Sequence, residues 1–198
     1  AEAYKGDGMY IPCKAEKTQE IEEITAAATL NKEKQNASFQ KTGSTYEEIV
    51  TKSMKGKAII DMQASDHAIG SLIMQYDETP WKFAKRMAST LGAPICANID
   101  TEIPTVTIGI PNTGKNYELS DVEYGYESDG EKINTIITSN QAVQIGDKVS
   151  YGGSSDVVKQ YKSNMQGGVL KTTVYIIPEA EATGMNSGKA DSKKQITN

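Results

Sequence analysis

Short runs in which apolar and polar residues alternate fill the second half of the chain. Turn-forming clusters rich in Gly, Asn, Asp and Ser separate these runs at a spacing of about ten residues. The six runs are PTVTIGIPN, YELSDVEYGYE, KINTIITS, VQIGDKVSYGG, DVVKQYKS and GVLKTTVYII. Because an apolar period of two with regular turns is typical of antiparallel barrels and sandwiches, we predict a β-rich second half.

The first half contains two segments with helical spacing instead. In STYEEIVTKSM, Ser44 and Glu47 have the spacing of a capping box, and Gly56 follows the last apolar residue. We therefore predict a short amphipathic helix near residues 45–55. The apolar positions of this helix are Tyr46, Ile49, Val50 and Met54.

The second helix has better marked ends, in QYDETPWKFAKRMASTLGAP. Thr79 suits the cap position, Pro80 suits the first helical position, and Gly92 stops the helix near residue 91, with Pro94 soon after. The positions predicted to be buried are Phe83, Ala84, Met87, Ala88 and Leu91. Those predicted to face water are Lys82, Lys85, Arg86 and Ser89.

Together these patterns predict an α+β fold that is mainly β, with an antiparallel barrel-like domain and two short packing helices. The segment from Ile24 to Leu30 is ambiguous, because apolar residues alternate there among good helix formers. Residues 179–198 are polar and small and have no period, so we predict a mobile polar tail or a linker.

The charge and composition exclude several classes of partner. The chain of 198 residues has a net charge of −5, and its 21 basic residues are scattered, so we expect no nucleic acid binding. No apolar run approaches the ~20 residues that a membrane helix needs. The first residues, AEAYKGDGMY, do not resemble a signal peptide, and we expect synthesis in a cytoplasm.

Candidate catalytic and metal-binding residues are few. Cys13 and Cys96 lie far apart in the sequence, and we expect both to be buried thiols rather than a disulfide. A pairing of His67 with Cys96 as base and nucleophile is the one hydrolase arrangement available, but no third residue to orient the histidine is evident. One histidine and two distant cysteines supply too few ligands for a metal, so we expect no metal and no cofactor.

The remaining polar clusters have structural explanations. We interpret Glu20, Glu22 and Glu23 as a solvated face, and Asp77 with Glu78 as acids that favour a helix N-terminus. The pairs Gly152–Gly153 and Gly167–Gly168 each lie between two strand-like runs, which predicts hairpin turns. An alternative function is a cell-wall glycan-binding module with an aromatic platform, formed by Tyr117, Tyr124, Tyr126, Tyr151, Tyr161 and Tyr175.

Three segments resemble the hub family of contractile injection systems. QYDETPWKFAKRMASTLGAP resembles a marker segment of phage late control protein D, of phage baseplate hubs and of the N-terminal part of the type VI spike protein VgrG. ASFQKTGSTYEEIV resembles the Phe-Gln segment upstream, and residues 145–176 resemble the closing strands of Gram-positive prophage members. Pro80 and Ala37 depart from the pattern, and the first strands of the family's first barrel have no counterpart before Ala1.

This resemblance implies a mechanical role without an enzymatic activity. It implies a partial first hub domain over residues 1–110, a second β-barrel-like tube domain over 111–178, and a strand at Ile24–Leu30. It also implies a homotrimeric baseplate ring that joins a hexameric inner tube to a trimeric spike. The expected partners are the inner tube protein, the central spike protein and other baseplate proteins, in a phage virion or phage-tail-like particle assembled in the bacterial cytoplasm. The basic side of the helix, with Lys82, Lys85 and Arg86, is then expected to contact a neighbouring subunit or baseplate protein.

Overall fold

The computed structural model describes residues 15–18, 30–99, 102–120, 122–128, 133–166 and 168–188. They form two compact units, and the chain passes between the units three times. Residues 30–114 and 178–188 belong to one, here called the helical unit, and residues 15–18 and 115–177 to the other, here called the strand unit. The fold is α+β and mainly β, as the sequence predicts.

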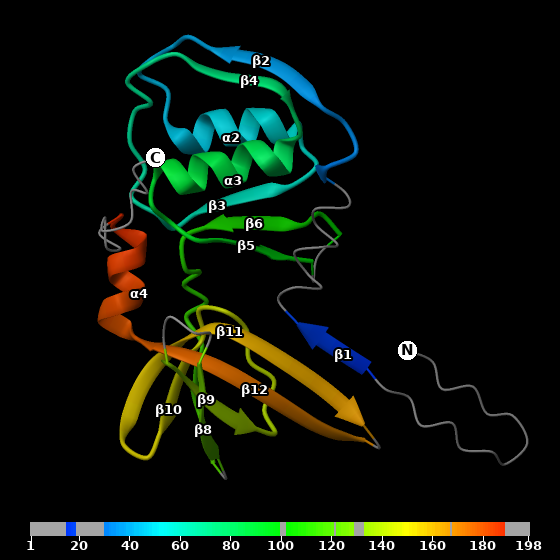
Figure 1. The fold of residues 1–198 in the computed structure, drawn as a ribbon, viewed down its shortest axis with the longest axis vertical. Coiled ribbons are helices and arrows are strands. Elements are labelled where there is room, and N and C mark those ends of the chain that lie inside the picture. Colours follow the sequence, from blue (N-terminus) through cyan, green and yellow to red (C-terminus); the bar gives the residue numbers. More distant parts are fainter. Residues whose placement is uncertain are drawn as a thin grey trace, which may run out of the picture. The chain divides into compact units, whose positions relative to one another are not determined.

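The helical unit has helices packed between two small sheets (Figure 1). One sheet pairs β2 (Gln35–Phe39) with β4 (Ile73–Glu78), and these strands are antiparallel. The other has the order β3-β6-β5. Its strands are β3 (Ile59–Met62), β6 (Thr105–Ile108) and β5 (Ile95–Asn98). The β3–β6 pair is parallel and the β5–β6 pair is antiparallel.

Helix α3 (Pro80–Thr90) has the predicted ends and the predicted packing face. The Thr79 side chain accepts a hydrogen bond from the backbone N–H of Lys82, Pro80 occupies the first turn, and Gly92 follows with a φ of 66°. All five residues of the predicted stripe are buried, and so is Trp81. The residues predicted to face water are all exposed.

Helix α2 (Tyr46–Met54) also lies where it is predicted, but its cap differs. The side chain of Thr45, not Ser44, accepts from the backbone N–H of Glu48. The carboxylate of Asp66 accepts from the next two free amides, those of Tyr46 and Glu47. The capping box is therefore wrong, because a long-range partner satisfies the amides that a local side chain was expected to bind.

Helix α4 (Glu179–Asn186) replaces the first part of the predicted tail. Asn186 fixes its end, because its side chain accepts from the N–H of Ile110 (2.6 Å) and donates to the carbonyl of Ile110 (3.0 Å). The backbone carbonyl of Asn186 also accepts from the N–H of Ser65. The mobile tail is thus wrong for residues 179–188, and residues 189–198 lie outside the described residues.

The strand unit is one curved sheet with the order β7-β10-β11-β12-β9-β8, to which β1 adds by pairing with β11. Its strands are β1 (Ala15–Thr18), β7 (Asn116–Glu118), β8 (Glu123–Ser128), β9 (Ile133–Ser139), β10 (Lys148–Tyr151), β11 (Ser154–Gln166) and β12 (Val169–Pro178). All pairings that the described residues define are antiparallel except β7–β10, which is parallel.

The sheet of the strand unit curls, but in the described part of the chain its hydrogen bonds do not close it into a barrel. Side chains bridge the gap instead: the Tyr124 ring on β8 lies 5.7 Å from the Tyr151 ring on β10. The Gln141 amide beyond β9 donates to the carbonyl of Glu118 on β7. The strand unit is therefore consistent with the barrel-like domain that the sequence predicts, with side-chain contacts in place of a closed hydrogen-bond ladder.

Two smaller expectations concern turns and the early strand. Gly152 and Gly153 form the predicted hairpin turn between β10 and β11, and both have a positive φ, as a two-residue hairpin requires. Gly168 also has a positive φ, between β11 and β12, whereas Gly167 lies outside the described residues. Of the strand predicted over Ile24–Leu30 only Leu30 is described, and its backbone is helical.

Candidate functional site

The two motif segments of the first half meet in the β2–β4 sheet and the helix below it. Strand β2 ends with Phe39, which stacks on Phe83 of α3 with ring centroids 5.5 Å apart and an interplanar angle of 26°. The guanidinium of Arg86 lies over the Phe83 ring, 5.2 Å from its centroid. The sequence separates these rings by 44 positions, and the β2–β4 pairing brings them together.

Arg86 holds β4 and α3 together through three hydrogen bonds. Its Nε and one terminal nitrogen bind the two carboxylate oxygens of Glu78, at 3.2 and 2.7 Å. The same terminal nitrogen donates to the carbonyl of Met74, at 2.7 Å. A bidentate pair of this kind fixes the geometry as well as adding energy. The Glu78 carboxylate is therefore bound within the fold by Arg86.

The other polar residues of the motif are also used inside the fold. Gln75 is fully buried, and its amide donates to the carbonyl of Glu78 at 3.0 Å. Asp77 forms an exposed ion pair with Lys34 at 2.6 Å, and its N–H donates to Asn36. Its φ of 48° accompanies a register shift opposite, between Gln35 and Ala37. Asp77 and Glu78 thus bind different cations and do not form an acid and nucleophile pair.

The outer face of β4 is the main apolar surface of this region. Leu72, just before the strand, and Met74 and Tyr76 within it are 55%, 54% and 76% exposed. These alternate positions share one face, which we call the β4 stripe. Three large apolar side chains in a row differ from the scattered exposed residues of an ordinary surface and are typical of a protein contact.

The basic side of α3 is smaller than the sequence predicts. Lys82 and Lys85 are exposed, and neither forms an ion pair within the described part of the chain. Arg86, however, is bound to Glu78, Met74 and Phe83. Two lysines, rather than three cations, are therefore available to a partner.

The structure does not bring the hydrolase candidates together. His67 is exposed; its ring packs edge-on against Tyr46, and its Nδ1 lies 3.4 Å from the carbonyl of Ser65. Cys96 is a buried thiol on β5, opposite Thr107 in the ladder. No group of three His, Cys, Asp or Glu side chains suited to a metal occurs among the described residues. Cys13, Glu20, Glu22 and Glu23 lie outside them.

The six tyrosines do not form one platform. Tyr161 is buried, Tyr117 is half-buried, and the Tyr124 and Tyr151 rings pack against each other. Tyr151 donates its hydroxyl to Asp156, and burial together with that carboxylate raises the pKa of Tyr151 above its ordinary value. Tyr126 is 76% exposed and belongs to a different strand face from Tyr175.

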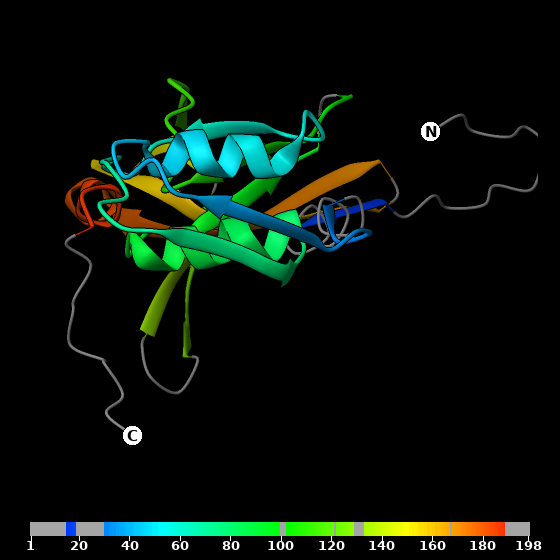
Figure 2. The ribbon, with the colours of Figure 1, turned by 90° about the horizontal axis from the view of Figure 1, so that it is seen from above.

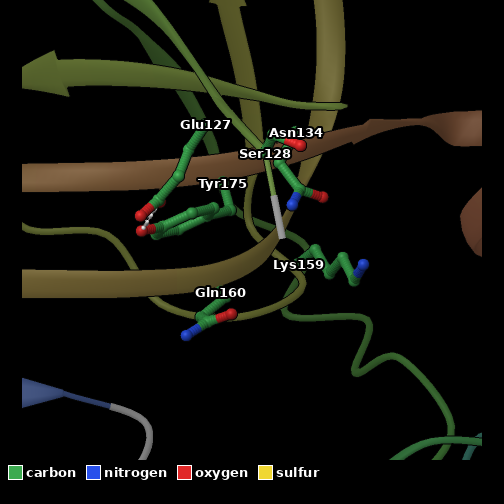
Figure 3. Close-up of a pocket in the computed structure, with 6 residues that line it drawn as sticks. All are labelled: Glu127, Ser128, Asn134, Lys159, Gln160 and Tyr175. Carbon is green, nitrogen blue, oxygen red and sulfur yellow. Dashed lines mark hydrogen bonds between the residues drawn. The ribbon is translucent and has the colours of Figure 1, made fainter. Parts of the chain in front are cut away.

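A polar pocket of about 270 Å³ lies on the face that carries Tyr175 (Figure 3). The Tyr175 hydroxyl donates a hydrogen bond to the Glu127 carboxylate at 2.5 Å, and this bond, together with burial, raises the pKa of Tyr175. The other lining residues are Ser128, Asn134, Lys159 and Gln160. Among the described lining residues Glu127 is the one carboxylate, and it is bound to the Tyr175 hydroxyl.

Comparisons with known proteins concern the fold. No protein-family model and no curated protein sequence matches the chain. In the described part of the chain, no helix is both long enough and apolar enough to span a membrane.

Solved structures do match. The E. coli c3393 protein, a type VI secretion component described as structurally similar to T4 tail proteins gp27 and gp5, has a TM-score of 0.57 at 16% identity. This match covers 79% of the chain and 54% of the c3393 protein.

Two tail proteins match over a larger share of their own length. The tail protein of Neisseria meningitidis MC58 has a TM-score of 0.55 at 10% identity, covering 82% of this chain and 73% of that protein. The 43 kDa tail protein of prophage MuSo2 from Shewanella oneidensis has a TM-score of 0.51 at 11% identity, with 77% and 71% covered. The chain thus has a fold similar to that of phage tail and type VI secretion proteins.

Proposed function

We propose that this chain is a structural hub of a contractile phage tail or tail-like injection particle. In this role three copies form a baseplate ring that joins a hexameric inner tube to a trimeric spike, after assembly in the bacterial cytoplasm. One observation carries the proposal: the two segments that resemble the hub family become a single packed site, through Phe39 on Phe83 and Glu78 on Arg86. The fold likeness to tail proteins supports it independently.

The use of polar groups in the motif is consistent with a structural role rather than an enzymatic one. Gln75, Glu78 and Arg86 each bind other groups of the same unit, so none is directed at a substrate. In the proposed role the helical unit corresponds to the first hub domain. The strand unit corresponds to the second tube domain.

The β4 stripe is the surface that we assign to assembly. Its three side chains lie at the outside of a two-stranded sheet, and Lys82 and Lys85 belong to the adjoining helix. A tube, spike or neighbouring hub subunit that covers the stripe removes apolar surface from water, which is the dominant favourable term in most protein association.

Light scattering and electron microscopy of the chain, alone and with its tube and spike partners, test the assembly. The proposal expects a trimeric ring, and it expects Leu72→Ser/Met74→Ser/Tyr76→Ser to weaken ring formation or partner binding. Ile59→Ser is the matched control, because Ile59 is equally exposed on the other sheet of the unit. A wild-type chain that stays monomeric and binds neither partner contradicts the proposal.

Charge reversal tests the helix separately. Lys82→Glu/Lys85→Glu is expected to slow or weaken assembly in a salt-dependent way, because both lysines are exposed and act through water. Lys32→Glu/Lys41→Glu makes the same change in net charge elsewhere in the unit and is expected to have little effect. Equal behaviour of the two double variants removes α3 from the interface.

A further inference from the structure

Met74 is the most exposed methionine among the described residues. It is 54% exposed, and Met165 in the strand unit is 43% exposed. The remaining methionines that the structure describes are half-buried or buried, namely Met54, Met62, Met87 and Met185. Since a dissolved oxidant must reach the sulfur atom, Met74 and Met165 are the two of this set that it attacks first.

Met74 lies in the middle of the β4 stripe, between Leu72 and Tyr76. Its partner in the β2–β4 ladder is Ser38, which is also exposed. Figure 2 shows β2 and β4 in front of α3, and in this view no other described element of the helical unit lies over them. The thioether of Met74 therefore belongs to an open surface and not to the core.

The backbone at Met74 is held in place by contacts that do not involve its side chain. Its carbonyl accepts a hydrogen bond from Arg86 at 2.7 Å, and the residue pairs with Ser38 in the ladder. On the inner side of the same sheet, Phe39 stacks on Phe83. A polar change at the exposed side chain of Met74 removes none of these contacts, so we expect the fold to tolerate it.

Oxidation by a peroxide is such a change. One oxygen atom passes from hydrogen peroxide to the sulfur, so the thioether is oxidised by two electrons to a sulfoxide and the peroxide is reduced to water. A methionine sulfoxide reductase reverses the step with a dithiol, which becomes a disulfide as the oxygen leaves in water. The apolar side chain thus becomes polar, and the change is reversible.

The sulfoxide has different consequences for an uncovered and a covered stripe. In the uncovered chain, water solvates the new oxygen. Under a partner the same oxygen is buried, and a buried acceptor without a donor is unfavourable. A partner that covers the stripe also keeps peroxide away from the sulfur. Oxidation therefore weakens covering, and covering slows oxidation.

We propose that Met74 is an oxidation site that switches the β4 stripe between an apolar and a polar surface. The oxidant is a peroxide, and the polar state rejects the tail partner of the proposed function. The switch rests on that function, because it needs a partner that covers the stripe. The site of oxidation follows from the exposure of Met74 alone.

Peptide mass spectrometry of the full chain during brief peroxide treatment tests the site. Met74 and Met165 are expected to be oxidised first, and Met54 and Met87 at least about tenfold more slowly, because burial excludes the oxidant. Circular dichroism is expected to show that the oxidised chain keeps its fold. Oxidation of Met74 no faster than that of Met54 overturns the inference, and so does unfolding of Met165→Leu when its Met74 is oxidised.

Two single variants test the switch, each compared with its own untreated form. In Met165→Leu, peroxide is expected to weaken ring formation or partner binding about fivefold or more, the loss expected for one buried acceptor without a donor. Methionine sulfoxide reductase with dithiothreitol is expected to restore assembly. In Met74→Leu, which has no sulfur in the stripe, the same treatment is expected to change assembly by less than about twofold.

Protection by the partners is the converse measurement. With tube and spike partners present, oxidation of Met74 is expected to slow at least about fivefold relative to that of Met165. Equal losses of assembly in the two variants, or an unchanged ratio of the two rates, overturn the switch and leave the tail role standing. An untreated wild-type chain that does not assemble contradicts the proposed function itself, and the switch falls with it whatever the rates of oxidation.

Discussion

At the scale of single residues, the polar side chains of the β4–α3 segment stabilise the fold. Gln75, Glu78 and Arg86 bind one another's strand or helix, and Thr79 both caps α3 and donates its hydroxyl to Asn31. Sequence reasoning identified the cap and the apolar stripe because their signals are local. The helical pattern also predicts that Arg86 is exposed, as it is. The hydrogen bond from Arg86 to the carbonyl of Met74, 12 positions away, has no local signal in the sequence.

Arg86→Ala is expected to lower the free energy of unfolding by about 1–2 kcal/mol, since it removes hydrogen bonds to a charged partner and a ring contact. Because the Arg86–Glu78 ion pair is partly exposed, water screens it, and the expected loss of stability is no larger than this. Lys85→Ala, one position away and without a partner in the described part of the chain, is expected to change stability by less than about 0.5 kcal/mol. Urea denaturation of both variants measures the difference. Equal losses would show that the Arg86 contacts contribute nothing specific.

Tyr151 gives a prediction that depends on pH. Burial, the hydrogen bond to Asp156 and the charge of Asp156 all raise its pKa above the ordinary value of about 10. Asp156→Asn removes the charge, so the pKa is expected to fall while staying above the ordinary value because burial remains. Absorbance at 295 nm during an alkaline titration, with Tyr151→Phe to assign the transition, measures the shift.

The sign of the stability effect follows from the same shift. Below pH 10 the phenol is neutral in both the folded and the unfolded chain, so its contribution to stability is complete. Above that pH the unfolded chain ionises first, and stability is lost as the pH rises toward the folded pKa. A Tyr151 that titrates with the exposed tyrosines in wild-type protein contradicts the structure at this position.

At the scale of elements, a helix end is predictable from the sequence when the residues that fix it are close to it in the chain. Helix α3 is bounded by Thr79, Pro80 and Gly92, all within or next to it, and its limits were predicted. The cap of α2 lies at Thr45, one position after the predicted residue, and the Glu47 amide that the capping box was expected to bind donates instead to Asp66, 19 residues away. Helix α4 was missed because it buries little besides Ala182, and the bond that fixes it joins Asn186 to a residue 76 positions away.

Asn186→Ala is expected to release α4 from the helical unit. It removes two partly buried hydrogen bonds to the backbone of Ile110, which together contribute about 1–2 kcal/mol. Hydrogen exchange of the amides at 179–186 is expected to accelerate, whereas Ser187→Ala, which loses a bond within the helix, is expected to leave most of that protection. Gly109→Ala offers an independent test.

A Cβ at Gly109 would lie 2.6 Å from the Asn186 side-chain oxygen and 2.9 Å from the N–H nitrogen of Ala64, at a φ of 108° that only glycine adopts readily. The same acceleration in 179–186 is therefore expected. Unchanged exchange in both variants would mean that other contacts dock the helix.

At the scale of the whole molecule, the sequence predicts the class of fold but not which strands pair with one another. Alternating runs separated by turns identify strands, but nothing in them distinguishes a closed barrel from a curled sheet bridged by Tyr124 and Tyr151. The parallel pairs β3–β6 and β7–β10 join strands that are far apart in the sequence. The division into two units, each made of separate parts of the sequence, depends on these same long-range pairings.

The single tryptophan makes the two cores separately measurable. Trp81 is buried in the helical unit, so its fluorescence follows unfolding of that unit. Ile49 in the helical unit and Ile137 in the strand unit are both fully buried, and replacing either by alanine is expected to cost about 2–5 kcal/mol in its own core. Ile49→Ala is therefore expected to lower the tryptophan-detected midpoint in urea, while Ile137→Ala lowers a transition followed by far-ultraviolet circular dichroism. If Ile137→Ala shifts the tryptophan transition as much as Ile49→Ala does, the units unfold as one cooperative body, because a core in one unit can affect a probe in the other only through coupled unfolding.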